Sequence, residues 1–185
     1  ATIIADMPAW VAFWSGFKND FLGLPAPNTL VGPNGRDGNW GYLAGGRFAV
    51  ADDEAVLVTL DPAGSYYTGF QITDPWTIAP DPMLRLASLN KSQCVLNSDG
   101  TVTYAIALAD PGIANWIDTC GLHDGWMLTR WQGVPADAAM EPLIREVRLV
   151  KLDAIPGDIP RVDLDHRRAQ IAKRASGFAM RTSAE

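Results

Sequence analysis

Short runs of β-forming residues, separated by turn-forming residues, follow one another through the middle of this chain. Clear examples are Ala55–Leu60, Tyr66–Thr73 and Gly125–Gln132. The sequences Asp61-Pro62-Ala63-Gly64 and Ser98-Asp99-Gly100 are typical of turns. Further strands are expected at Arg47–Val50, Gln93–Asn97, Thr101–Leu108 and Ile144–Leu152. Because no amphipathic helix separates these runs, the pattern predicts a mainly β fold, an antiparallel sandwich or barrel.

A helix is expected before the β-rich region. Large apolar residues at positions 3, 7, 10, 14, 17 and 21 form one helical stripe, and Ile4, Val11 and Phe13 widen it. We therefore predict an apolar N-terminal helix within residues 1–23 that is buried on more than one side. It packs either under the main domain or against a partner, which is a missing N-terminal segment or a second copy in a homo-oligomer.

The β-sandwich domain is expected over residues 24–155, with Leu24–Gly41 as a loop rich in proline and glycine. A C-terminal helical tail is expected over residues 156–185, where Val162–Phe178 predicts a polar, basic helix. Its cations are Arg167, Arg168, Lys173 and Arg174. A charge run of this kind is usually a solvated face. The alternative is that it docks on an acidic surface of its own sandwich or of a neighbour.

Composition narrows the function classes. The formal net charge of −6 argues against nucleic acid as the main partner, because phosphate binding needs a basic surface. No apolar run approaches the ~20 residues of a membrane span, and no secretory signal is visible. Cys94 and Cys120 both lie in apolar contexts and are expected as buried free thiols. We therefore expect a cytoplasmic protein.

The stretch Asp110–Gln132 combines turn formers and tryptophans with polar and charged residues, which is unusual for a plain core strand. Its acid–base candidates are His123, Asp118 and Arg130. If Asp118 orients His123 and Arg130 faces the same cavity, the three could bind and convert an anionic or carbonyl-bearing substrate. The alternatives are also physical: Asp118 satisfies turn amides, His123 faces solvent, and Arg130 pairs with a carboxylate on a sheet face.

A second functional class is a non-catalytic ligand-binding or assembly module. The residues that could line its binding face are Trp126, Trp116, Asn115, Tyr67 and Trp76. Strand alternation places Trp126, Leu128 and Arg130 on one face and Met127, Thr129 and Trp131 on the other. A small organic or carbohydrate-like ligand is expected in either class. No metal site or cofactor is expected, because the two histidines lack the spacing of zinc ligands.

An ordered set of short motifs adds a family resemblance. The motifs are Gly46-Arg47-Phe48, Asp53-Glu54-Ala55, Tyr67, Asp74-Pro75-Trp76, Ser88-Leu89-Asn90 with Ser92-Gln93, Asp99-Gly100-Thr101, Asp110-Pro111-Gly112, Asn115-Trp116-Ile117-Asp118-Thr119 with Gly121, and Arg130-Trp131-Gln132. With these motifs, which span about half of the chain, it resembles the bacterial domain of unknown function 1214. The resemblance implies an antiparallel jelly-roll-like sandwich that forms the C-terminal part of a longer protein. It implies no particular reaction.

Overall fold

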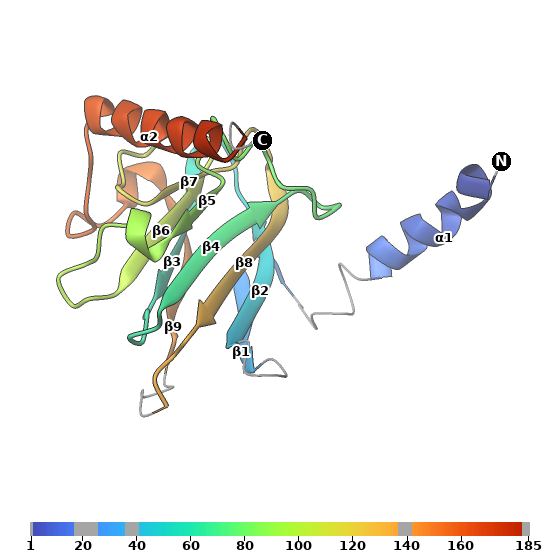
Figure 1. Ribbon diagram of the computed structural model, residues 1–185, viewed down its shortest axis with the longest axis horizontal. Coiled ribbons are helices and arrows are strands. Elements are labelled where there is room, and N and C mark those ends of the chain that lie inside the picture. Colours follow the sequence, from blue (N-terminus) through green and yellow to red (C-terminus); the bar gives the residue numbers. More distant parts are fainter. Residues whose placement is uncertain (1, 17–25, 36–40, 137–141, 183–185) are drawn as a thin grey trace.

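Two β-sheets form the body of the protein in a computed structural model that describes residues 2–16, 26–35, 41–136 and 142–182 (Figure 1). The five-stranded sheet has the order β1 (Thr29–Gly35), β2 (Tyr42–Ala49), β8 (Asp124–Gln132), β4 (Tyr67–Thr73) and β5 (Ser88–Asn90). The four-stranded sheet has the order β7 (Trp116–Asp118), β6 (Val102–Ala107), β3 (Glu54–Leu60) and β9 (Ile144–Lys151). The prediction of a mainly β fold is therefore confirmed.

The strand pairing is antiparallel in every ladder among the described residues except one. β7 runs parallel to β6, with Trp116 opposite Ala105 and Asp118 opposite Ala107. The expectation of a wholly antiparallel fold is therefore wrong at this pair. Short 3₁₀ helices, η3 (Lys91–Gln93) and η4 (Leu152–Ala154), follow β5 and β9.

The core lies between the two sheets. Phe70 of β4 stacks on Tyr104 of β6 with a ring-centroid distance of 4.6 Å, which joins the two sheets across the middle. Trp131 of β8 is fully buried and donates its indole N–H to the Asp61 carbonyl at 2.8 Å. A buried aromatic of this size contributes ~3–5 kcal/mol relative to alanine, so this row of rings fixes the spacing of the layers.

The short strands β5 and β7 were not expected from the sequence, and two further segments also differ from the expectation. The edge strand β1 lies within the predicted loop Leu24–Gly41, and among the described strands it pairs only with β2. The predicted strand Gln93–Asn97 is not a strand. The Asn115 carboxamide bonds both the N–H and the C=O of Val95 at 2.8 Å. This side chain therefore occupies the position that a neighbouring strand would take.

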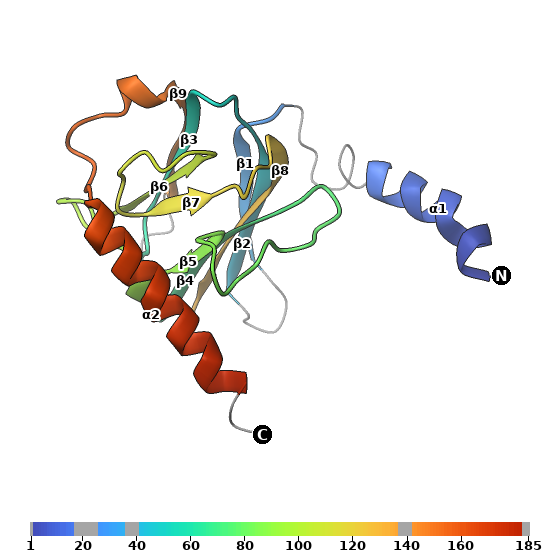
Figure 2. The ribbon, with the colours of Figure 1, turned by 90° about the horizontal axis from the view of Figure 1, so that it is seen from above.

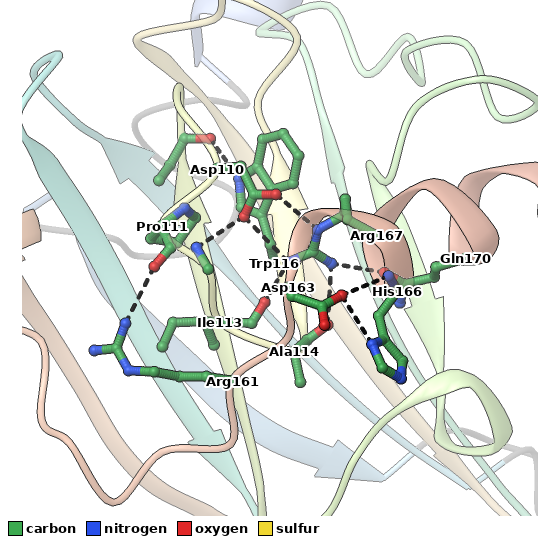
Figure 3. Close-up of polar contacts among 12 residues, drawn as sticks. Asp110, Pro111, Ile113, Ala114, Trp116, Arg161, Asp163, His166, Arg167 and Gln170 are labelled. Carbon is green, nitrogen blue, oxygen red and sulfur yellow. Dashed lines mark hydrogen bonds and ion pairs between the residues drawn. The ribbon is translucent and has the colours of Figure 1, made fainter.

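The C-terminal helix α2 (Leu164–Thr182) packs across the end of the sandwich that carries β5 and β7 (Figures 1 and 2). Arg167, which is 4% exposed, holds it there through both carboxylate oxygens of Asp110, at 2.8 and 3.1 Å. The same guanidinium bonds the carbonyls of Ile113 and Ala114 and lies 5.3 Å from the ring centroid of Trp116 (Figure 3).

The basic face of α2 is therefore not uniformly solvated. Arg167 and Arg174 are buried against the sandwich, whereas Arg168 and Lys173 are exposed. The alternative in which the helix docks on an acidic surface of its own sandwich holds for Arg167, whereas Arg174 docks on oxygens of Pro82 and Ser88. The carboxylate of Asp110 is the acidic partner for Arg167.

The N-terminal helix α1 (Thr2–Gly16) stands apart from the sandwich in both views (Figures 1 and 2). Its Met7, Trp10, Val11 and Phe13 side chains are exposed. Of the two alternatives for this helix, packing under the main domain is not seen among the described residues, and a partner for it stays a prediction. Phe17 and Phe21, which completed the predicted stripe, lie outside the described residues. No described helix has the length and apolar character needed to cross a membrane.

Candidate ligand-binding site

His123 lies in the turn before β8 and is exposed. Its Nδ1 atom is 2.9 Å from the Val50 carbonyl oxygen, and its Nε2 atom is 3.6 Å from the carboxylate of Asp52, which is itself 89% exposed. Both ring nitrogens therefore face groups of the β2–β3 connection. The structure does not bring His123 to Asp118.

Asp118, at the end of β7, is buried and has its carboxylate fully engaged. Arg85 Nε lies 2.8 Å from one oxygen, and the Cys120 backbone N–H donates to the other at 2.8 Å. These contacts stabilise the turn that carries Cys120 at a φ of 58°. The interpretation of Asp118 as a residue that satisfies turn amides matches this geometry.

Arg130 lies elsewhere, on the outer face of the five-stranded sheet. Along β8 the side chains of Met127, Thr129 and Trp131 are buried between the sheets, whereas Arg130 is exposed. The predicted alternation of faces is therefore confirmed. The Arg130 guanidinium makes no hydrogen bond or ion pair with any residue that the structure describes, so the alternative of a paired carboxylate does not apply within that part of the chain.

The side chain of Arg130 lines a cavity of about 310 Å³, which we call the α2 pocket. It lies between the outer face of β4, β5 and β8 and the C-terminal half of α2. Its polar lining consists of Tyr67, Gln71, Ser88, Asn90, Gln93, Arg130 and Arg174. Its apolar lining consists of Gly69, Phe70, Leu89, Leu128 and Phe178. A cavity of this size lies at the lower end of the ~300–1,000 Å³ range of small-molecule sites.

Gly69 is at the centre of the pocket floor. In the sheet register it faces Arg130 of β8 on one side and Asn90 of β5 on the other. The end of the Tyr67 ring lies over it, since a β-carbon at residue 69 would meet the Tyr67 hydroxyl oxygen at 2.2 Å. Cross-strand neighbours have β-carbons ~5 Å apart. A phenol hydroxyl, a guanidinium and a carboxamide therefore surround this glycine.

Arg174 forms the wall that comes from α2, and it is 8% exposed. Its Nε atom donates to the Pro82 carbonyl, and its two terminal nitrogens donate to the carbonyl and hydroxyl oxygens of Ser88 at 2.8 and 2.7 Å. These bonds use three of the five guanidinium N–H donors. Two donors are left for a ligand.

The charged side chains in the described lining of the α2 pocket are all positive. Two arginines line it, and no carboxylate is among the described residues of its lining. Desolvation at its buried position lowers the pKa of Arg174, and the charge of Asp81 acts in the opposite direction. A guanidinium still keeps its proton at neutral pH, so a buried positive charge without a carboxylate partner favours an anion in this cavity.

Of the five predicted ligand-binding residues, only Tyr67 lines this pocket. Trp116 is 9% exposed and its ring packs against the guanidinium of Arg167. Asn115 is fully buried and its side chain hydrogen-bonds the backbone of residue 95. Trp126 is 2% exposed and donates its indole N–H to the Pro75 carbonyl. Trp76 is half exposed on the loop between β4 and β5. The first three therefore have packing roles, and Trp76 lies apart from the α2 pocket.

Sequence reasoning missed Gly69, Gln71, Asn90 and Arg174. Alternation from Tyr67 along its predicted strand would have placed Gly69 and Gln71 on the same face. The strand β5 gave no usable signal because it has only three residues. No sequence signal distinguishes Arg174 from its neighbours, because its position depends on how α2 docks.

Other parts of the described structure give less support for a binding site than the α2 pocket does. No cluster of three or more His, Cys, Asp or Glu side chains suited to a metal ion occurs in the described part of the chain. A second cavity, of about 480 Å³, adjoins the α2 pocket and shares Leu89, Gln93, Arg174 and Phe178 with it. Its lining continues along α2 toward Val162 and includes Leu86, Val95 and Ala114. Cys94 and Cys120 are both free thiols and partly buried.

Comparisons with known proteins give neighbours without a described function. No family model matches the chain, and no curated protein matches it. Among solved structures, an uncharacterised protein from Burkholderia cenocepacia is 31% identical with a TM-score of 0.55 over 62% of this chain and 31% of that one. The VPA0106 protein from Vibrio parahaemolyticus is 14% identical with a TM-score of 0.42 over 62% of this chain and 33% of that one. The chain thus spans about a third of their length.

Proposed function

We propose that this chain is a ligand-binding module that holds a small organic anion in the α2 pocket. The observation that carries the proposal is the exposed guanidinium of Arg130, which has no partner among the described residues and faces the same cavity as the buried Arg174. Arginine is the side chain best suited to bidentate binding of carboxylate or phosphate.

Charge elsewhere on the molecule supports this assignment. The chain has a formal net charge of −6, yet this cavity contains two cations and no described carboxylate. By contrast, Arg47 on the same sheet face pairs with Asp124 at 3.2 Å. An exposed arginine that only kept this surface soluble would not require a cavity without carboxylates around it. The proposed ligand supplies the missing negative charge.

Binding is a better account than acid–base conversion. The described residues that line the α2 pocket include no histidine, aspartate, glutamate or cysteine. His123 and Asp118 each bond groups of other connections, as described above. The set His123, Asp118 and Arg130 therefore does not assemble a proton carrier beside a ligand held by Arg130.

The proposal has a direct test in solution. Anionic and neutral ligands of matched shape, such as benzoate and benzamide, would be titrated into the full chain by NMR. We expect the anions, and not the neutral ligands, to change the chemical shifts of residues in β4, β5 and α2. Arg130→Gln should weaken their binding by ~1.5–3 kcal/mol, the usual contribution of a hydrogen bond to a charged group. The matched control is Arg168→Gln, on the exposed side of α2, which should bind as the unmodified chain does. Equal binding of benzoate and benzamide would contradict the proposal.

The remaining expectations belong to the same proposal. We place the chain in the family of the bacterial domain of unknown function 1214, with a jelly-roll-like sandwich, on the motifs described above. The free thiols of Cys94 and Cys120 favour a reducing, cytoplasmic compartment. The exposed apolar side chains of α1 favour a partner for that helix, either a second copy or another segment of a longer chain.

A further inference from the structure

Several polar groups of the α2 pocket have no hydrogen-bond partner within the described part of the chain. The Gln71 carboxamide and the Tyr67 hydroxyl make no hydrogen bond there, and both side chains line the cavity. Gln93 and Asn90 use their carboxamide oxygens, which accept from the Asn90 N–H at 3.0 Å and from the Ser92 hydroxyl at 2.6 Å. Their two NH₂ groups are left over.

These groups set a condition on the ligand. A ligand that covers a polar group without bonding it must remove water from that group, which weakens binding. A plain aliphatic or aromatic carboxylate would satisfy the arginines but would leave three carboxamides and a phenol unpaired. A ligand with several hydroxyl groups around its ring would bond them, because a hydroxyl both donates and accepts.

These groups lie around one residue of the pocket lining, Gly69, and next to it along β4. Arg130 and Asn90 lie on opposite sides of Gly69, and the Tyr67 hydroxyl lies over that glycine. Gln71 is the next residue of β4 on the same face. The apolar lining from Leu128 and Phe178 offers contact to the C–H groups of a ring. The cavity of about 310 Å³ suits a ligand of this small size.

From this arrangement we infer that the ligand of the α2 pocket is a sugar acid, a polyhydroxylated ring whose carboxylate binds Arg130. The remaining donors of Arg174 support the same carboxylate or a neighbouring hydroxyl. The carboxamides of Gln71, Asn90 and Gln93 bind the other hydroxyls. This inference rests on the proposed function, since it requires that Arg130 holds an anion, and it specifies the chemical class of that anion.

Calorimetric titration of the full chain with three kinds of probe tests the inference. The probes are hexuronates (glucuronate, galacturonate and mannuronate), cyclohexanecarboxylate, which has a ring and a carboxylate but no hydroxyls, and glucose, which has the hydroxyls but no carboxylate. We expect at least one hexuronate to bind about tenfold or more tightly than either analogue, because a site built to bond hydroxyls discriminates against ligands that lack them.

Two variants separate the hydroxyl contacts from the carboxylate contact. Gln71→Leu should weaken hexuronate binding about tenfold and leave cyclohexanecarboxylate binding unchanged, since residue 71 bonds only hydroxyls. Arg130→Gln should weaken both by a similar factor. Gln71 is exposed on the sheet surface, so the variant should fold, and a thermal melt checks this. Tyr67→Phe, which removes only the hydroxyl, provides a second variant of the same kind.

Each possible outcome has a distinct meaning. If cyclohexanecarboxylate binds as tightly as every hexuronate and depends on Arg130, the sugar-acid inference is overturned and the proposed function stands. If glucose binds as tightly as the hexuronates, the anionic character of the ligand is overturned as well. If none of the probes binds and other organic anions do, only the inference falls. Hexuronate binding that Arg130→Gln and Gln71→Leu leave unchanged would also overturn it.

Discussion

The end of the Tyr67 side chain occupies the space in which a side chain of Gly69 would stand. A β-carbon on residue 69 would lie 2.2 Å from the Tyr67 hydroxyl oxygen and 2.7 Å from the ring carbon that carries it. The backbone conformation does not require glycine at residue 69, because its φ is not in the left-handed region. The absence of a side chain at residue 69 therefore allows the Tyr67 ring to lie along β4 over this position.

Gly69→Ala should displace the Tyr67 ring without unfolding the protein. The atoms that clash are at the far end of a flexible, 39%-exposed side chain, so the change in unfolding free energy should stay within about 1 kcal/mol. Ligand binding should weaken severalfold, because the hydroxyl leaves the pocket floor. Thermal melts and titrations with the same ligands measure the two effects.

The control for this variant is Gly157→Ala, where an added β-carbon meets nothing within 4 Å. It should alter neither stability nor binding by a measurable amount beyond the small entropic gain of alanine. A Gly69→Ala protein that binds as tightly as this control would show that Tyr67 has no part in the site.

The sequence predicted the fold more closely than it predicted the site. The strands β4 and β8, which alternate over part of their length, and β3, a continuous apolar run, were identified because their burial follows from hydrophobic pattern alone. The edge strand β1 was missed, since its glycines and Pro33 are typical of a loop and its pairing depends on β2. The residues 93–97 satisfied the strand pattern, but the Asn115 side chain replaces the expected partner strand.

The site was partly predictable for a related reason. Alternation along β8 placed Arg130 on the open face, and this is a local property of one strand. The convergence of His123 and Asp118 with it was not a local property. Those residues lie at turns whose direction is set by contacts with Asp52 and Arg85. Arg174 reaches the pocket only because α2 docks, which no single segment encodes.

Arg167→Ala should destabilise the protein strongly. The guanidinium is buried and bonds the Asp110 carboxylate and the carbonyls of Ile113 and Ala114, so its removal takes a charged donor from all three groups and leaves Asp110 with the Gly112 N–H. The expected loss is roughly 2–4 kcal/mol in the free energy of unfolding, measured by urea denaturation. Loss of the helix anchor should also weaken ligand binding, because α2 supplies one wall of the pocket.

The neighbouring Arg168 provides the matched control. It forms an exposed ion pair with Asp165, with side chains 77% and 89% exposed, so Arg168→Ala should cost no more than about 0.5 kcal/mol. Similar losses for the two variants would mean that α2 is held by general charge attraction and not by the buried contacts of Arg167.

Cys94 should resist alkylation at moderately alkaline pH. Burial raises the pKa of this thiol to about 11 from its ordinary value of 9.0. At pH 8 the thiolate fraction is then about a hundredfold lower than in an unperturbed thiol, and only the thiolate reacts. In a Cys120→Ser background, iodoacetamide should label the folded chain about a hundredfold more slowly than the urea-unfolded chain. Equal rates would show that Cys94 is accessible and unperturbed.

The same shift predicts how stability depends on pH. Because the pKa of Cys94 is higher in the folded state, the folded chain keeps this proton while the unfolded chain loses it. The contribution of Cys94 to stability is therefore complete below pH 9 and is lost as the pH rises toward 11. Cys94→Ala should show a shallower decline in unfolding free energy over this window. An unchanged decline would assign the effect to other groups.

Arg130→Ala and His123→Ala separate the two functional classes that the sequence left open. The Arg130 side chain is exposed and bonds no described residue, so its loss should change stability by less than about 0.5 kcal/mol while ligand binding falls at least about tenfold. His123 bonds the Val50 carbonyl outside the pocket, so its loss should cost about 0.5–1.5 kcal/mol of stability and leave binding unchanged. Thermal melts and titrations of both variants measure this contrast. If His123→Ala abolished turnover of a ligand that it still binds, an acid–base enzyme would be the correct description, and the contacts of His123 with residues 50 and 52 would have to rearrange when that ligand binds.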